Sequence, residues 1–211
     1  MGRVCVDMSM SLDGFVAGPN TDAQNPLGVG GTRLHRWLFA DPQDPRDTAI
    51  SAEVRDGVGA VVLGRTTFDV GVDIWGDVPY PVPCFVLTHR GRDELVMRSG
   101  TFTFVTDGVA AAVALAVAAA GVRNVEVMGG GTARQVIAAG LLDELQINLV
   151  PVLLGGGVRM FPELDGDQVE LERSRVVESS TVTHLRYRVS RPTEQPPSPR
   201  AVAPSKVADG P

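Results

Sequence analysis

Short apolar runs separated by turn residues recur along the chain, and their lengths suit the strands of an α/β sheet. GAVVLG at 59–64 lacks polar alternation, a pattern typical of a strand buried on both faces. Further apolar runs predict strands at 3–9, 82–88, 102–106, 125–129 and 144–153. The segments 168–179 and 181–190 alternate between apolar and polar residues, which predicts a closing antiparallel hairpin.

Helical segments lie between the predicted strands. They cover 33–39, 49–56, 65–71, 108–120 and 132–139. The alanine-rich segment 108–120 can be capped by Thr106 or Asp107, and Gly121 ends it. This alternation predicts a mainly parallel, twisted sheet with helices on both faces and antiparallel strands at its edge.

The composition changes after Arg191. Residues 191–211 contain six prolines and no aromatic residue, so they offer too little apolar surface to offset the entropy of ordering. We therefore expect one folded domain over residues 1–190 and a Pro-rich disordered tail over residues 191–211.

Charge and hydropathy exclude several classes of partner. A formal net charge of −6 disfavours a nonspecific nucleic-acid binder, which needs a basic face for phosphates. The most apolar segment, 110–120, is too short to span a bilayer, and the N-terminus shows no secretory apolar region. We expect a cytoplasmic protein with no nucleic-acid or membrane partner.

The cysteines and histidines do not suggest a metal site. Cys5 and Cys84 each lie in an apolar stretch, which predicts two buried free thiols in a reducing compartment. The three histidines are far apart in sequence and show no zinc-ligand spacing, so no metal is expected and a zinc deaminase is excluded.

Two predicted strands end in glycine just before a predicted helix. A helix N-terminus presents unpaired N–H groups that attract anions, and glycine lets the backbone approach a pyrophosphate closely. Position 134 is Arg, so the second turn is not a Rossmann fingerprint. The turns could still hold one dinucleotide from two sides, or be ordinary tight turns; their residues are Gly64, Arg65, Thr66, Thr67, and Met128, Gly129, Gly130, Gly131, Thr132.

A third strand end carries Thr88, His89 and Arg90. Open α/β sheets bind ligands at the carboxyl ends of their strands, and an arginine fork suits a phosphate. Arg65 and Arg90 taken singly are also typical of solvated surface charges.

Taken together, these motifs resemble the dihydrofolate reductase-like superfamily. The segments SMSLDGFVAGPN, VVLGRTTFD, VLTHR and VEVMGGGTARQVIAAGLLDELQINLVPVLLGGG, with the closing hairpin, are most similar to the C-terminal reductase domain of bifunctional riboflavin deaminase-reductases and its stand-alone relatives. The resemblance covers about residues 3–190. It implies a three-layer α/β/α sandwich, a mainly parallel sheet with an antiparallel C-terminal hairpin, and a homodimer.

The resemblance also implies a cofactor and a reaction. NADPH would give hydride to a pterin- or pyrimidine-like heterocycle or a carbonyl, as in the 5-amino-6-(5-phosphoribosylamino)uracil reductase activity of riboflavin biosynthesis. The three strand ends would hold the pyrophosphate and adenosine. Ser9 and the 12–18 loop, which ends at Gly18, would lie near the nicotinamide.

The substrate side is less defined by sequence. Folate reductases carry a carboxylate on the helix before the GRTTF strand, where this chain offers Asp47 and Glu53. Glu53 and Asp13 are our candidate catalytic acids. A solvated helix residue is the commoner explanation for a glutamate such as Glu53, and a turn aspartate explains Asp13 equally well. Trp37 and Phe39 are candidates for stacking on a flat substrate, or for core packing.

Two hypotheses remain from the sequence. The first is an NADPH-dependent reductase of a small heterocyclic substrate. The alternative is a non-catalytic NADP(H)-binding or regulatory protein of the same fold, which the absence of a clear acid or base favours.

Overall fold

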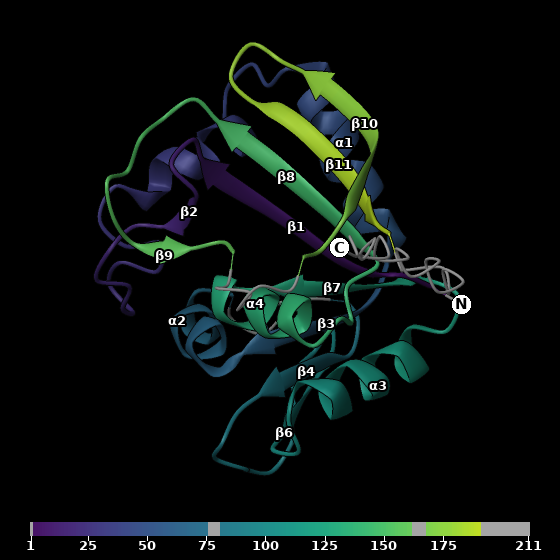
Figure 1. Cartoon of the computed structure of the whole chain (residues 1–211). Helices are drawn as coiled ribbons and strands as arrows, with labels where there is room; N and C mark the ends of the chain where they lie inside the picture. The colour runs from purple at the N-terminus through teal and green to yellow at the C-terminus, as the bar shows by residue number, and fades with distance from the viewer. Residues whose placement is uncertain (1, 76–80, 162–167, 191–211) are drawn as a thin grey trace, which may run out of the picture.

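The computed structural model describes residues 2–75, 81–161 and 168–190, and its centre is a nine-stranded sheet (Figure 1). The strand order is β10-β11-β8-β1-β7-β3-β4-β6-β5. The strands are β1 (Val4–Ser11), β3 (Val58–Gly64), β4 (Cys84–Leu87), β5 (Leu95–Val96), β6 (Thr101–Val105), β7 (Asn124–Met128), β8 (Glu144–Val150), β10 (Leu171–Glu178) and β11 (Thr183–Val189).

The sheet is parallel through its middle and antiparallel at both edges. Strands β8, β1, β7, β3, β4 and β6 pair in parallel, whereas β11 and β10 on one side and β5 on the other pair antiparallel. The predicted mainly parallel sheet with an antiparallel C-terminal hairpin is therefore confirmed.

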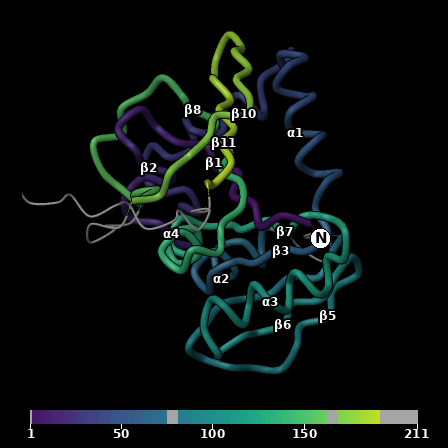
Figure 2. Tube along the Cα trace, turned by 45° about the vertical axis from the view of Figure 1, so that its right-hand side comes forward, coloured from purple at the N-terminus to yellow at the C-terminus, as the bar shows by residue number. Residues whose placement is uncertain are grey.

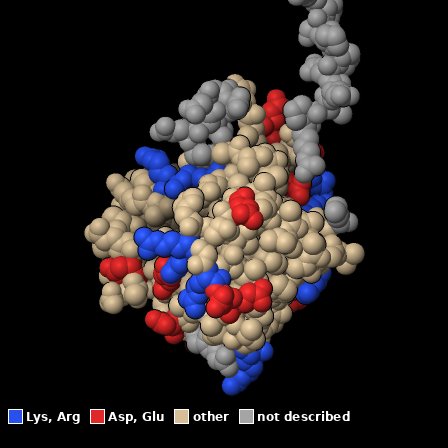
Figure 3. Space-filling view, turned by 90° about the horizontal axis from the view of Figure 1, so that it is seen from below, with Lys and Arg blue, Asp and Glu red and all other residues tan. Residues whose placement is uncertain are grey.

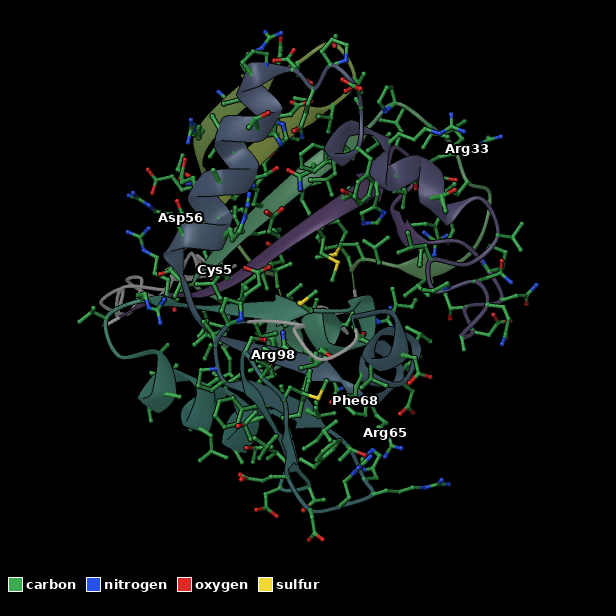
Figure 4. All side chains as sticks on the ribbon, turned by 180° about the vertical axis from the view of Figure 1, so that it is seen from behind. Cys5, Arg33, Asp56, Arg65, Phe68 and Arg98 are labelled. Carbon is green, nitrogen blue, oxygen red and sulfur yellow. The ribbon has the colours of Figure 1, made fainter. Side chains whose placement is uncertain are left out.

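Helices cover both faces of this sheet. Helices α3 (Val109–Ala120) and α4 (Gly130–Ala138) pack with Ala60 and Val62 of β3 in one core. Helix α2 (Arg65–Trp75) packs Phe68 on the opposite face, with Val61 and Leu63. Helix α1 (Pro45–Gly57) lies on the same face as α2, across β8 and β11 (Figure 4). The predicted three layers are confirmed.

Three local expectations need correction. Among the described residues no side chain caps α3, because Gly108, with φ of 89°, takes the N-cap position in place of Thr106 or Asp107. Strand β8 ends at Val150 rather than at 153, because Pro151 has no N–H for the ladder. Helix α1 begins before residue 49, since Asp44 caps it and Pro45 fits its first turn.

A small second sheet closes over the carboxyl end of β1. It pairs β2 (Phe15–Ala17) with β9 (Val158–Arg159), and neither strand was predicted from the sequence. Next to it lies η1 (Gly31–Leu38), a 3₁₀ helix where a short helix was expected.

The central sheet opens between β1 and β7. These strands pair only at Val4↔Val125 and Cys5↔Glu126, whereas β1 continues along β8 as far as Ser11. Beyond Cys5 the two strands diverge, so one part of the sheet tilts away from the other (Figures 1 and 2).

Two further findings concern membranes and the tail. No helix in the described ranges is long and apolar enough to cross a membrane. The predicted tail at 191–211 lies outside the described residues.

Candidate active site

The three strand ends singled out in the sequence lie side by side. Strand β3 is hydrogen-bonded to both β7 and β4, with Leu63 opposite Met128 and Gly64 opposite Leu87. All three strands are parallel, so their carboxyl ends face the same edge of the sheet. The turns that follow β3, β4 and β7 therefore form one continuous rim.

The two glycine turns interlock. A Cβ added at Gly64 would lie 2.7 Å from Thr132 Oγ1, and one added at Gly129 would collide with Thr67 Oγ1. Each helix thus places a threonine against the glycine that precedes the other helix. Within the described residues no side chain caps α4, and Gly129 has a φ of 87° that favours glycine. This arrangement fits a phosphate group between two helix N-termini.

Charged and polar groups stand beside these turns. Arg65 at the start of α2 pairs with Asp69 one helical turn later, with Nε 2.7 Å from Oδ1. Thr88 is buried and its hydroxyl accepts a hydrogen bond from the Arg90 amide, while the side chains of His89 and Arg90 are exposed. On the face seen from below, basic side chains alternate with acidic ones (Figure 3).

The loop after β1 is tied down by its own acid. The Asp13 carboxylate accepts hydrogen bonds from the backbone N–H groups of Leu154 and Gly155. A hydrogen bond from Ser11, followed by these amides, lowers the pKa of Asp13 to about 2. The 12–18 loop and the 155–157 glycines are thereby held together. The hydrogen bonds of Asp13 thus hold two loops together, and its catalytic role stays a prediction.

Glycines let these loops approach closely. Gly18 and Gly157 leave no room for a Cβ, because Val29 O and Ala17 O lie against them. Gly130, at the start of α4, lies beneath Val16 and Val158 of the small sheet. The 12–18 loop therefore lies directly over the Gly129–Gly131 turn, and its place beside a nicotinamide stays a prediction.

The other predicted acid, Glu53, lies on α1 where the helix meets the C-terminal hairpin. Its carboxylate accepts hydrogen bonds from Arg175, 2.6 Å away, and from Arg186. These partners, Arg186 first, lower the pKa of Glu53. The geometry ties the helix to the C-terminal hairpin, and a catalytic role for Glu53 stays a prediction.

The residues predicted to contact substrate have different surroundings. Trp37 is 4% exposed, and its indole N–H donates to Ser9 Oγ at 3.0 Å. Phe39 is 81% exposed. Ser9 and Trp37 are both buried, and Trp37 packs in an apolar core cluster with Leu34, Val150 and Val182. Phe39 lies at the surface, and a substrate contact for either ring stays a prediction.

Two carboxylates that were not predicted line the opening between β1 and β7. The Asp7 N–H donates to Glu126 Oε1 at 3.1 Å, where a longer β1–β7 ladder would have supplied a backbone carbonyl. Burial raises the pKa of Asp7 to about 6, and burial followed by the charge of Asp7 raises the pKa of Glu126 well above its usual range. Acids with raised pKa values are typical of sites that move protons.

A buried chain of polar side chains leads away from Asp7. Its carboxylate accepts hydrogen bonds from Gln146 at 3.2 Å and from Asn148 at 2.6 Å. Asn148 then contacts His184, which contacts Asp47 on α1. The described side chains contain no group of three or more His, Cys, Asp or Glu suited to a metal ion. These polar side chains thus form one hydrogen-bond network that joins β1, β8, β11 and α1.

A model of one protein family matches residues 3–185, described as the RibD C-terminal domain. The chain belongs to the RibD C-terminal domain family. This confirms the family resemblance of the sequence motifs, and the chain is a reductase-like domain of the RibD type. No curated protein matches the chain.

Solved structures agree with the RibD assignment. A protein from Shewanella sp. PV-4 described as a riboflavin biosynthesis protein is 25% identical, with a TM-score of 0.67 over 90% of this chain and 99% of that one. A pyrimidine reductase-like protein from Corynebacterium diphtheriae is 13% identical, with a TM-score of 0.60 over 90% and 92%. The dihydrofolate reductase of Enterococcus faecalis, complexed with NADP(H), is 16% identical, with a TM-score of 0.52 over 90% and 98%. The dihydrofolate reductase-like fold is thus confirmed.

The sequence did contain a signal for the missed acids. Asp7 and Glu126 each interrupt an otherwise apolar strand, VCVDMSM and VEVM. A charged residue inside such a strand is rarely buried without a partner, so its position indicates a special environment. The partner residues on β8 and β11 could not be found this way, because strand pairing brings them together across more than 130 positions.

Proposed function

We propose that the chain is an NADPH-dependent reductase that acts on a small nitrogen heterocycle carrying N–H donors, such as an aminopyrimidine. The interlocked glycine turns at Gly64 and Gly129 carry this proposal, because a Cβ at either position would push away the threonine of the other helix and separate the two helix N-termini that would share the phosphates. The NADP(H) complex of the Enterococcus faecalis reductase and the description of the Corynebacterium diphtheriae protein as pyrimidine reductase-like support it.

The residues that would hold NADPH lie along the rim. Gly64–Thr67 and Gly129–Thr132 would bind the pyrophosphate through backbone N–H groups and hydroxyls. Thr88, His89 and Arg90 would lie at the adenosine end, where the exposed Arg90 suits a 2′-phosphate. Bound there, NADPH supplies a hydride to an electron-poor carbon of the acceptor.

The carboxylates at the opening would serve the acceptor ring. Asp7 is ionised above about pH 6 and can accept a hydrogen bond from a ring or amino N–H. Glu126 keeps its proton to a higher pH and can deliver that proton to a ring nitrogen. Two neighbouring acids in different protonation states match the needs of a reaction that adds a hydride and a proton.

The first test is the binding of NADPH and NADH to the purified protein, followed by nicotinamide fluorescence. We expect Arg90→Ala to weaken NADPH binding about tenfold and to leave NADH binding unchanged, because only NADPH carries the 2′-phosphate. Arg123→Ala is the matched control, since Arg123 precedes β7 at the opposite end of the strands.

Each outcome has a clear meaning. If Arg90→Ala loses the preference for NADPH over NADH and Arg123→Ala keeps it, the result would support a 2′-phosphate site at Arg90. Failure of wild-type protein to bind either nucleotide would overturn the reductase proposal. Tight NADPH binding without turnover of any aminopyrimidine would favour the non-catalytic alternative.

A further inference from the structure

His184 on β11 is held from both sides in the protein interior. The side chain is 2% exposed, its Nδ1 lies 2.6 Å from Asn148 Oδ1, and its Nε2 lies 2.9 Å from Asp47 Oδ1. Trp37 packs edge-on against the ring with centroids 5.0 Å apart. The imidazole therefore cannot rotate without breaking two hydrogen bonds and a ring contact.

The orientation of the Asn148 amide decides which nitrogen of His184 carries a proton. The Asn148 NH₂ group donates to Asp7 Oδ1, so its carbonyl oxygen faces His184. An amide oxygen only accepts, which requires a proton on His184 Nδ1. On the other side, Nε2 faces a carboxylate oxygen of Asp47, so one more proton lies between these two atoms.

The reversed amide would need a different set of protons. With the NH₂ group turned to His184, Nδ1 would have to be bare and the Asn148 oxygen would face Asp7. Two oxygens can share a hydrogen bond only if Asp7 is protonated. The state of His184 and the charge of Asp7 are thus linked through one amide group.

We propose that His184 is a positioning residue that keeps its Nδ1 proton and, through Asn148, holds Asp7 as an ionised acceptor for an N–H group of the substrate. This inference rests on the proposed function for the identity of the ligand, and not for the state of the histidine. Asp7 is only partly buried, whereas Asp47 is 1% exposed behind His184. Asp7 is therefore the carboxylate that meets the substrate, and Asp47 anchors the ring.

The charges around the network favour this state. Asp47 faces the ring from α1 and Asp7 lies beyond Asn148 on β1. Arg186, on the same strand as His184, donates two hydrogen bonds to Gln146 Oε1, which turns the Gln146 NH₂ group to Asp7. Glu126 on β7 is an acidic neighbour of Asp7, and the charge of Asp7 helps to raise the pKa of Glu126, whereas the charge of Arg186 lowers that of Asp7. Both amides consequently present donors to Asp7.

The first experiment reads the histidine directly. Imidazole ¹⁵N NMR of the wild-type protein at pH 7 separates protonated from bare ring nitrogens, and the His184 signals are assigned by their loss in a variant. We expect a proton on Nδ1 of His184. A signal from bare Nδ1 would overturn the proposal, whether or not the protein binds NADPH.

The second experiment separates the two hydrogen bonds of the His184 ring, one with Asn148 and one with Asp47. The amide nitrogen of asparagine overlays imidazole Nδ1, and that of glutamine overlays Nε2, so His184→Asn keeps the donor to Asn148 and His184→Gln keeps the contact with Asp47. The probe is 5,6-diaminouracil, titrated calorimetrically into the NADPH-loaded protein. We expect His184→Gln to weaken binding of the probe about tenfold and His184→Asn to keep it within about threefold.

The outcomes distinguish this inference from the proposed function. Equal losses in both variants, or none in either, would show that the ring only fills space and would overturn the positioning role. No binding of the probe to wild-type protein that holds NADPH would overturn the assignment of Asp7 as the acceptor of substrate donors. Failure to bind NADPH at all would overturn the proposed function. The imidazole signals would still test the protonation of His184, because they do not depend on the cofactor.

Discussion

At the scale of single residues, the protein places a carboxylate where its charge is costly. Burial raises the pKa of Asp7, and the hydrogen bond from Asn148, the charge of His184 and the hydrogen bond from Gln146 oppose the rise only in part. An acid whose pKa is higher in the folded than in the unfolded chain stabilises the fold while it is protonated. That contribution is complete below pH 3.8 and is lost as the pH rises through about 6.

Asp7→Asn should therefore flatten the pH dependence of stability. Between pH 4 and pH 6.5 we expect the wild-type protein to lose more free energy of unfolding than the variant, because only wild-type Asp7 becomes charged. Urea unfolding at several pH values measures this difference. A steeper loss in Asp7→Asn than in the wild type would contradict the raised pKa.

Asp13→Asn is the control of opposite sign. Hydrogen bonds lower the pKa of Asp13 to about 2, so its contribution is present above pH 3.8 and is lost as the pH falls toward 2. This variant should remove stability at pH 5 and 7 alike and leave the slope between them unchanged.

At the scale of elements, the contact between the first turns of α2 and α4 sets the shape of the rim. Gly64→Ala would bring its new Cβ to 2.7 Å from Thr132 Oγ1. We expect a loss of about 1–3 kcal/mol of stability from overpacking, together with weaker NADPH binding. The double variant with Thr132→Ala should recover part of the stability, because it removes the colliding atom.

Gly131→Ala provides the matched comparison for this contact. Apart from its own helix backbone and chain neighbours, no heavy atom of the described residues lies within 4 Å of a Cβ at Gly131, so the substitution should be tolerated. Thermal unfolding of the single and double variants gives the coupling energy. If the stability effects of Gly64→Ala and Thr132→Ala simply add in the double variant, the two turns do not touch, contrary to the geometry.

Local patterns predicted most elements and failed where long-range contacts decide. The apolar runs and glycine turns gave the strands β3 and β7 and the helices after them, because these signals lie within one segment. Strands β2 and β9 are too short to show a period, and they form by pairing across about 140 positions. Each turn of the rim was likewise visible in the sequence, since each is built from consecutive residues, whereas the network around His184 joins four elements and was not predicted.

At the scale of the whole molecule, the separation of β1 from β7 divides the candidate site into two parts with different chemical groups. The part with β7, β3 and β4 carries the glycine turns and the arginines of the rim, and the part with β1, β8 and β11 carries the Asp7–His184 network (Figure 2). Two backbone pairs and a shared apolar core join the parts. A cofactor and an acceptor bound to different parts would meet at the opening.

This division predicts where NADPH protects the backbone from hydrogen exchange. Binding at the rim should slow exchange at 64–68 and 129–134 at least about tenfold, because a ligand on those N–H groups must leave before they open. The hairpin of β10 and β11 should change little, since it lies at the far edge of the other part. Mass spectrometry with and without NADPH measures both segments in one experiment. Equal protection of the hairpin and the rim would contradict a division between the two parts, and protection of the hairpin alone would place the cofactor elsewhere.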